Sequence, residues 1–180
     1  MNHILYKRAD TLDELHQILH LQEQNLPESL TENEIRQEGF VTVHHDIGIL
    51  TAMNDQCKHV IAKLGDRLVG YALCMHPNFK NDIPILKPMF DRIESVIDPT
   101  KSYMVMGQIC IDKPFRGSGI FKGLYRFMKN ELRADAQWII TEVDQKNHRS
   151  MNAHQHLGFK KLIAYQADGI DWELIYLTTD

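Results

Sequence analysis

The residue types that could most clearly bind a ligand lie in the segment 109–122, which reads ICIDKPFRGSGIFK. An apolar run leads into a loop that carries Lys113, Arg116 and the glycines Gly117 and Gly119, and a helix is predicted directly afterwards. The first turn of a helix presents unpaired backbone N–H groups and the positive end of the helix dipole. Glycine lets the backbone approach a ligand closely. The segment therefore predicts a site for a phosphate or pyrophosphate group.

The spacing of the glycine and basic residues does not by itself identify the ligand of this loop. The nucleotide-binding motif G-x-x-x-x-G-K-S/T does not occur in the sequence. The dinucleotide-binding motif G-x-G-x-x-G fails because Lys122 stands where the third glycine is required. A strand-to-helix turn that uses glycine only for its backbone freedom is the structural alternative.

A second segment, residues 147–159 with the sequence NHRSMNAHQHLGF, narrows this choice. Together the two segments resemble the signatures of the GNAT N-acetyltransferase superfamily. The first signature is the pyrophosphate motif Q/R-x-x-G-x-G/A, which Arg116 and Gly119 match. The second is an Asn after a strand, a small residue three positions later and a short helix that ends in Gly-Phe. The resemblance covers about residues 60–180 well and the N-terminal part more loosely.

The resemblance implies an acetyl-CoA-dependent N-acetyltransferase that uses acetyl-CoA as cosubstrate, needs no metal and lets an amine attack the thioester directly. Two splayed central strands, at residues 109–111 and 138–144, are expected to hold the pantetheine arm, the first by backbone groups in the manner of an added strand. The expected cofactor-binding residues are Ile109, Cys110, Ile111, Arg116, Gly117, Ser118, Gly119, Ile120, Phe121, Asn147, Ser150 and His154.

Two of these residues depart from the family pattern. Phe121 stands where the family favours Gly or Ala, so its side chain is expected to turn away from the phosphates into the core. His154 occupies the position of a Tyr that commonly protonates the departing coenzyme A thiolate in the family. Because imidazole titrates near neutrality, His154 is expected to be an acid or thiolate stabiliser, or else to bind the cofactor or only pack.

Glu142 is the candidate for the catalytic base. Strand alternation places it on one side with Trp138, Ile140 and Asp144, inside an otherwise apolar strand. A charge is costly there without a role or a partner, so a base and a structural, hydrogen-bonded carboxylate are both consistent with it. Gln108 could orient a substrate but cannot act as a base. Cys110, on a central strand, is expected to be a small core residue rather than an acyl carrier.

The elements that must position these residues alternate along the chain. Hydrophobic periodicity and turn residues predict strands at residues 4–7, 59–64, 68–75, 103–112, 138–144, 160–166 and 171–178. Helices are predicted from residue 12, from residue 31 and over residues 46–54, 119–133 and 149–157. The fold class is therefore α/β (α+β), and the GNAT resemblance implies a mixed, mostly antiparallel central sheet with helices on both faces.

Residues 77–101 are less regular than the rest of the chain. They contain four of the six prolines, yet their apolar residues indicate a helix within the segment. We expect either an insertion or mobile flap over a site, or a surface helix that packs on the sheet.

Composition indicates the number of domains and argues against some classes of function. The chain has 180 residues, 43% of them apolar and 24% charged, which fits one domain over residues 1–180 with a sizeable core. The formal net charge of −4 argues against a broad nucleic-acid interface. No long apolar run or secretory signal is found, and three widely spaced cysteines give no disulfide framework. A cytoplasmic protein without membrane contact is expected.

The acceptor carries no recognisable signature in the sequence. A small-molecule or peptide amine is expected, and homodimerisation, common in the family, is possible for this chain. Two alternatives to the N-acetyltransferase stay open. The chain could be a non-catalytic acyl-CoA-binding or sensing module on the same fold, or it could use longer acyl groups.

Overall fold

The computed structural model describes residues 3–38 and 40–180, and its described strands form a single mixed sheet. The order across the sheet is β1-β2-β3-β4-β5-β7-β6, with β4 and β5 parallel and all other neighbours antiparallel. The strands are β1 Leu5–Arg8, β2 Val60–Leu64, β3 Arg67–Met75, β4 Tyr103–Ile111, β5 Trp138–Asp144, β6 Lys160–Ala167 and β7 Ile170–Thr178. The predicted mixed, mostly antiparallel sheet is therefore confirmed.

The helices follow the positions that the sequence predicts. They are α1 Leu12–Glu23, α2 Glu32–Glu38, α3 Ile47–Gln56, α4 Lys87–Val96, α5 Ile120–Leu132 and α6 His148–His156, with short 3₁₀ turns η1 Pro27–Ser29, η2 Pro77–Asn81, η3 Pro84–Leu86 and η4 Lys113–Phe115. Thr11, Asp46 and Asn147 cap α1, α3 and α6 with their side chains, which fixes where these helices begin. Within the described ranges, no helix combines the length and the apolar character that crossing a membrane requires.

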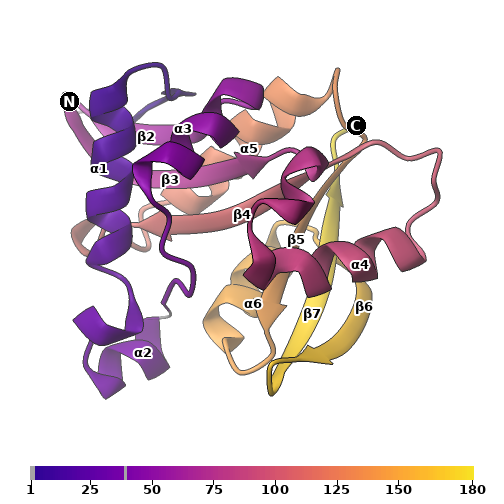
Figure 1. Ribbon diagram of the computed structural model, residues 1–180. Coiled ribbons are helices and arrows are strands. Elements are labelled where there is room, and N and C mark those ends of the chain that lie inside the picture. Colours follow the sequence, from indigo (N-terminus) through magenta and orange to yellow (C-terminus); the bar gives the residue numbers. More distant parts are fainter. Residues whose placement is uncertain (1–2, 39) are drawn as a thin grey trace.

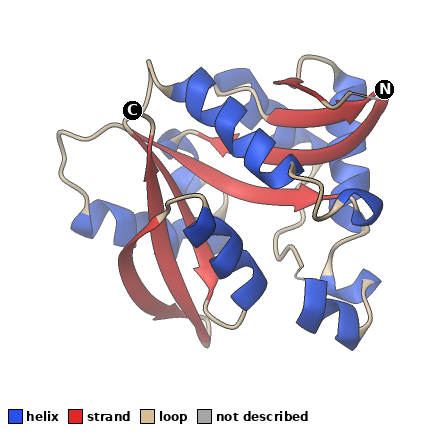
Figure 2. Ribbon diagram, turned by 180° about the vertical axis from the view of Figure 1, so that it is seen from behind, coloured by secondary structure: helices blue, strands red, loops and turns tan. Residues whose placement is uncertain are grey.

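Two hydrophobic cores lie on opposite faces of the sheet. On one face, α1, α3 and α4 bury side chains such as Ile18, Leu50 and Phe90 (Figure 1). On the other, α5 and α6 cover the sheet, and α5 buries Ile120 and Leu124 (Figure 2). The predicted arrangement of helices on both faces is thus confirmed.

The segment 77–101 contains the predicted helix, which is α4. Its Met89, Phe90 and Ile93 are buried in the first core, together with Phe79 from η2. This burial corresponds to the second of the two interpretations, a helix packed on the sheet.

The two central strands separate after a short paired stretch. Strand β4 pairs with β5 only over residues 103–105 and 138–140, while β5 pairs with β7 along its whole length. Gly107 is an extra residue in β4, because Leu73 pairs with Gln108 and Cys74 with Met106. Such a bulge bends its strand and increases the local twist. Beyond the bulge, β4 diverges from β5 and leaves an opening between the strands (Figure 2).

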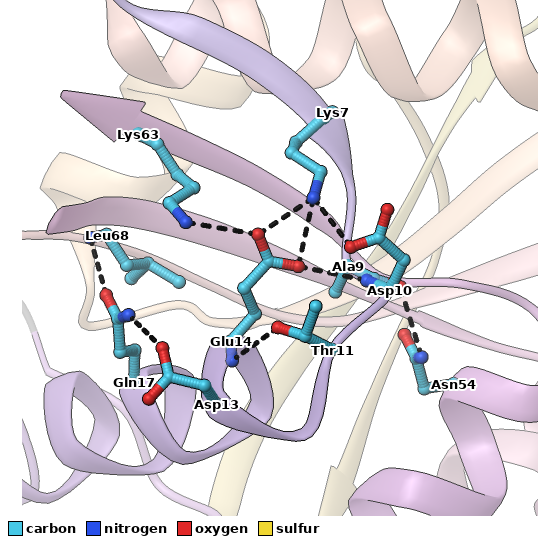
Figure 3. A network of polar contacts seen from close by, with 10 residues as sticks. All are labelled: Lys7, Ala9, Asp10, Thr11, Asp13, Glu14, Gln17, Asn54, Lys63 and Leu68. Atoms are coloured by element: carbon cyan, nitrogen blue, oxygen red, sulfur yellow. Dashed lines mark hydrogen bonds and ion pairs between the residues drawn. The ribbon is translucent and has the colours of Figure 1, made fainter. Parts of the chain in front are cut away.

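Helix α1 is tied to the sheet edge by a polar network around Glu14 (Figure 3). The Glu14 carboxylate accepts hydrogen bonds from Lys7 Nζ at 2.8 Å, from Lys63 Nζ at 3.1 Å and from the Asp10 backbone N–H at 3.0 Å. Because Asn25, two residues beyond α1, lines the site described below, this network helps to fix the N-terminal side of that site.

Candidate functional site

A groove of about 490 Å³ runs from the opening beside β4 to the N-terminus of α5. Its walls come from β4, the 113–119 loop, α5, α6, Asn25 and residues 40–41. The lining residues are Asn25, Phe40, Val41, Ile109, Cys110, Ile111, Phe115, Arg116, Gly117, Gly119, Ile120, Phe121, Lys122, Asn147, Arg149, Ser150, Ala153, His156 and Leu157. All predicted cofactor-binding residues except Ser118 and His154 therefore lie on one groove.

The glycine loop has the geometry of a cradle for an anionic group. Gly117 and Gly119 adopt φ angles of 76° and 88°, which side-chain-bearing residues rarely adopt, and no atom lies within 4 Å of a Cβ built on either. Helix α5 begins at Gly119 without a side-chain cap. Its first N–H groups, which have no partner within a helix, therefore face the groove, and the loop fits a pyrophosphate.

The charge of the groove is positive. Arg116, Lys122 and Arg149 line it, and no Asp or Glu is among its described lining residues. Lys113, by contrast, forms an ion pair with Glu34 of α2 and does not line the groove. The basic side chains in and after the loop thus have different tasks.

Arg116 holds the loop in place. Its Nε donates to the Ile111 carbonyl at 3.0 Å, and its Nη2 donates to Asn25 Oδ1 at 2.6 Å. Ser118 also shapes the loop, because its hydroxyl donates to the Phe115 carbonyl. These contacts hold the loop against β4 and against the end of α1.

Phe121 and His154 belong to a buried aromatic cluster. The Phe121 ring packs edge-on against Tyr125 and His154, each at 5.1 Å between centroids, so it has turned toward the core as expected. His154 Nδ1 donates to the Ser150 carbonyl at 2.8 Å, and its Nε2 accepts from the Tyr125 hydroxyl at 2.7 Å. Burial lowers the pKa of His154 to about 4. A neutral ring with both nitrogens engaged matches the packing role better than the role of an acid.

A smaller pocket of about 100 Å³ adjoins the groove between β4 and β5. It is lined by Phe40, Val41, Thr42, Met106, Gly107, Gln108, Ile109, Thr141, Glu142, Val143, Asp144, Asn147, Ser150, His154 and Trp172. The described lining contains two carboxylates and no Lys or Arg. Phe40, Val41, Ile109, Asn147 and Ser150 line both cavities and so mark the junction between them.

Glu142 lines the small pocket and has a hydrogen-bond partner. The Tyr165 hydroxyl of β6 donates to Glu142 Oε2. Burial raises the pKa of Glu142 to about 7, and the Tyr165 hydrogen bond opposes that rise. A carboxylate with this pKa can exchange a proton near neutral pH.

The remaining polar candidates of β4 are held by the protein itself. Gln108 Oε1 accepts from Gln22 Nε2 at 2.6 Å and from the Tyr71 hydroxyl at 2.5 Å, and Gln108 Nε2 donates to the Val43 carbonyl at 2.9 Å. Gln108 therefore anchors the segment that forms the pocket wall. Cys110 lines the groove, and burial raises the pKa of its thiol to about 12, so the thiol stays protonated at neutral pH.

Sequence reasoning did not identify the residues of the N-terminal wall of the site. Asn25, Phe40 and Val41 line the groove, and Trp172 of β7 lines the small pocket. No local pattern marks these residues, because only the tertiary fold brings them to β4 and the glycine loop. The turn after α1, at Leu26-Pro27, is the one nearby signal, and it indicates only that the helix ends.

Solved structures share this fold over nearly their whole length. A protein assigned to the GNAT family from Desulfovibrio desulfuricans has 13% identity and a TM-score of 0.67, with 99% of this chain and 100% of that chain covered. The yncA protein of Salmonella typhimurium, solved with its cofactor acetyl-CoA, has 12% identity, a TM-score of 0.65 and coverages of 98% and 94%. The ribosomal-protein-S18-alanine N-acetyltransferase of Escherichia coli has 11% identity, a TM-score of 0.63 and coverages of 98% and 94%.

A family assignment follows from the sequence match. No curated protein matches the chain. Residues 13–159, well over half of the chain, match the model of the acetyltransferase (GNAT) family. This range includes the glycine loop, both splayed strands and the Asn147 signature, all of which the structure brings to one groove. The chain therefore belongs to the acetyltransferase (GNAT) family.

Proposed function

We propose that this GNAT acetyltransferase transfers the acetyl group of acetyl-CoA to the nitrogen of an amine by direct attack. The observation that carries the proposal is the charge contrast between the two joined cavities. The groove contains three cationic side chains and no carboxylate among its described lining residues. The small pocket contains Glu142 and Asp144 and no Lys or Arg in its described lining. An anionic cosubstrate suits the first cavity and a basic amine suits the second.

The residues of the groove fit the parts of acetyl-CoA. Backbone N–H groups at the start of α5, with Lys122 and Arg149, would bind the phosphates. Backbone groups of β4 beside the opening would bind the pantetheine arm in the manner of an added strand. Acetyl-CoA supplies an activated thioester.

Glu142 would remove the proton from the attacking amine. Its carboxylate lines the pocket, and the Tyr165 hydroxyl holds one of its oxygens in place. Burial raises the pKa of Tyr165 far above neutrality, so this hydroxyl keeps its proton and does not compete for the one on the amine. Asp144 adds a second negative charge that attracts a basic amine.

Ser150 would stabilise the sulfur of the leaving group. Only Ser150 and Asn147 bring polar side chains to the junction between the described linings of the two cavities. His154 Nδ1 donates to the Ser150 backbone carbonyl, so this nitrogen carries a proton and cannot accept one from the Ser150 hydroxyl. The hydroxyl can therefore donate its own proton into the junction. A hydroxyl donor at that place lowers the cost of the developing thiolate.

An acetyl-CoA turnover screen over amine classes tests the proposal. Small amines, polyamines, aminoglycosides, peptides with free N-termini and peptides with lysine are each supplied with acetyl-CoA, and thiol release is followed. We expect release with at least one class. Tight acetyl-CoA binding by calorimetry without turnover of any class would support the sensing module instead, and a lack of binding would refute both.

A further inference from the structure

Asn25 joins two parts of the site that are far apart in the sequence. It lies just beyond the end of α1 and is 3% exposed. Its side-chain Oδ1 accepts from Arg116 of the glycine loop at 2.6 Å. Its backbone carbonyl accepts from the Val41 N–H, in the wall shared by the groove and the small pocket, at 3.1 Å. One buried residue therefore contacts the loop on one side and the wall on the other.

The position of Asn25 is itself fixed. Its Nδ2 donates to the Leu21 carbonyl at 2.8 Å, and its backbone N–H donates to the Gln22 carbonyl at 2.9 Å. Both halves of the amide are thus used, the donor on α1 and the acceptor on Arg116. Leu21 and Gln22 are themselves buried, so Asn25 is held against the buried last turn of α1.

The contact between Asn25 and Arg116 is stronger than another described link between the N-terminal segment and the loop, the Lys113–Glu34 ion pair. The side chains of that ion pair are 41% and 30% exposed. Exposed pairs contribute little, because water screens them. A buried hydrogen bond from a guanidinium is charge-assisted and has a defined geometry. A shift of the loop is therefore transmitted through Asn25 more effectively than through this ion pair.

We propose that Asn25 is a positioning residue that couples the glycine loop to the Val41 wall, so that acetyl-CoA binding orders the pocket for the amine. The inference rests on the proposed function, because it assumes that acetyl-CoA occupies the groove. Arg116 leads directly into Gly117 and Gly119, so a ligand on the loop restrains Arg116 and, through it, Asn25. By linkage, the amine and acetyl-CoA then strengthen the binding of each other.

Three variants test this coupling. Asn25→Ala removes the acceptor for Arg116, while Asn25→Asp keeps an oxygen acceptor there, adds a negative charge beside the guanidinium and loses the donor to Leu21. Asn54→Ala is the matched control, because Asn54 is also a buried Asn that joins a helix to the chain, through the Ala9 carbonyl at 3.2 Å (Figure 3), and it lies outside the site. Acetyl-CoA affinity is measured by calorimetry, and hydrogen exchange of residues 40–46 is measured with and without saturating acetyl-CoA.

In the wild type, we expect acetyl-CoA to slow exchange in residues 40–46. Asn25→Ala should bind acetyl-CoA at least about tenfold more weakly, as expected when a hydrogen bond to a charged group is lost. It should also lose the slowing of exchange at saturation, whereas Asn25→Asp should keep both. Asn54→Ala should lower the Tm but keep affinity and protection.

Wild-type affinity and protection in Asn25→Ala would overturn the coupling while leaving the proposed function intact. Equal losses in Asn54→Ala would also overturn it, because they would show a general effect of stability. A wild type that fails to bind acetyl-CoA would refute the proposed function, and this inference with it.

Discussion

Glu142 and His154 show how burial decides what a titratable side chain can do. Both line the small pocket. Burial raises the pKa of Glu142 to about 7 and lowers that of His154 to about 4, since it disfavours the charged form of each. Their residue types and places could be predicted from the sequence. Their protonation could not, because it depends on Tyr165, Tyr125 and the carbonyl of Ser150, which tertiary contacts bring into place.

The pH profile of turnover should report the ionisation of the Glu142 carboxyl group. A base must be deprotonated, so kcat/KM should fall as pH decreases through about 7. Glu142→Gln should lower kcat about 100-fold, within the range for loss of a general base, and remove this limb of the profile. Thiol release measured from pH 5.5 to pH 9 (roughly the range around the group's pKa) checks both effects.

His154→Gln is the matched control for this profile. Because His154 is already neutral over this range, the variant should keep the limb near pH 7 even where its stability decreases. If the fall in kcat/KM near pH 7 persisted in Glu142→Gln and disappeared in His154→Gln, the titrating group would be His154 and not Glu142.

At the scale of elements, the site depends on two local departures from regular structure. The bulge at Gly107 ends the pairing of β4 with β5, and the left-handed Gly119 starts α5. The strand, the loop and the helix could all be predicted from periodicity and glycine spacing. The bulge could not, because a register shift is a property of two paired strands and leaves no mark in either strand alone.

Gly119→Ala should weaken acetyl-CoA binding. Its φ of 88° disfavours any side-chain-bearing residue by about 1–2 kcal/mol, so the loop would relax away from its present conformation. Gly65→Ala is the control, because Gly65 also has a positive φ, 60°, with no atom within 4 Å of a built Cβ, in the β2–β3 turn. Calorimetry should show weaker binding only for Gly119→Ala, while thermal unfolding shows a lower Tm for both. An acetyl-CoA affinity of Gly119→Ala equal to that of the wild type would contradict the role of the loop in binding acetyl-CoA.

The Glu14 network predicts acid sensitivity of the α1 attachment. Burial raises the pKa of Glu14, but hydrogen bonds from the Asp10 N–H, Lys7 and Lys63 outweigh this and lower it to about 2 (Figure 3). A carboxylate with a lowered folded-state pKa stabilises the fold above its unfolded pKa, near 4.5, and this contribution is lost as pH falls toward 2.

Glu14→Gln should therefore destabilise the protein by about 1–3 kcal/mol at pH 7, the usual effect of losing hydrogen bonds to a charged group. The difference from wild type should shrink as the pH approaches about 2. Urea unfolding at several pH values measures it. Glu94→Gln, which breaks an exposed pair with Lys80, should change little. If the difference in free energy of unfolding between Glu14→Gln and the wild type did not change with pH, the Glu14 charge would not be what stabilises the attachment of α1.

At the scale of the whole molecule, the fold separates charge between two joined cavities. The net charge of −4 says nothing of this separation. Arg116 and Lys122 could be placed at a phosphate site from the sequence, but the wall of Phe40 and Val41 could not, because about 65 residues or more separate it from the β4 residues that it faces. The family and the glycine loop thus follow from local patterns, whereas the strand order and the wall of the small pocket follow only from tertiary structure.

The most direct test of the account is the stoichiometry of transfer at the joined cavities. Acetyl-CoA and the best amine from the screen are incubated with the wild type, and free coenzyme A and acetylated amine are quantified together. Direct attack by the amine predicts that the two products form in equal amounts and that both rates fall together in Glu142→Gln. Coenzyme A released without acetylated amine, or acetyl groups retained on the protein, would contradict the account.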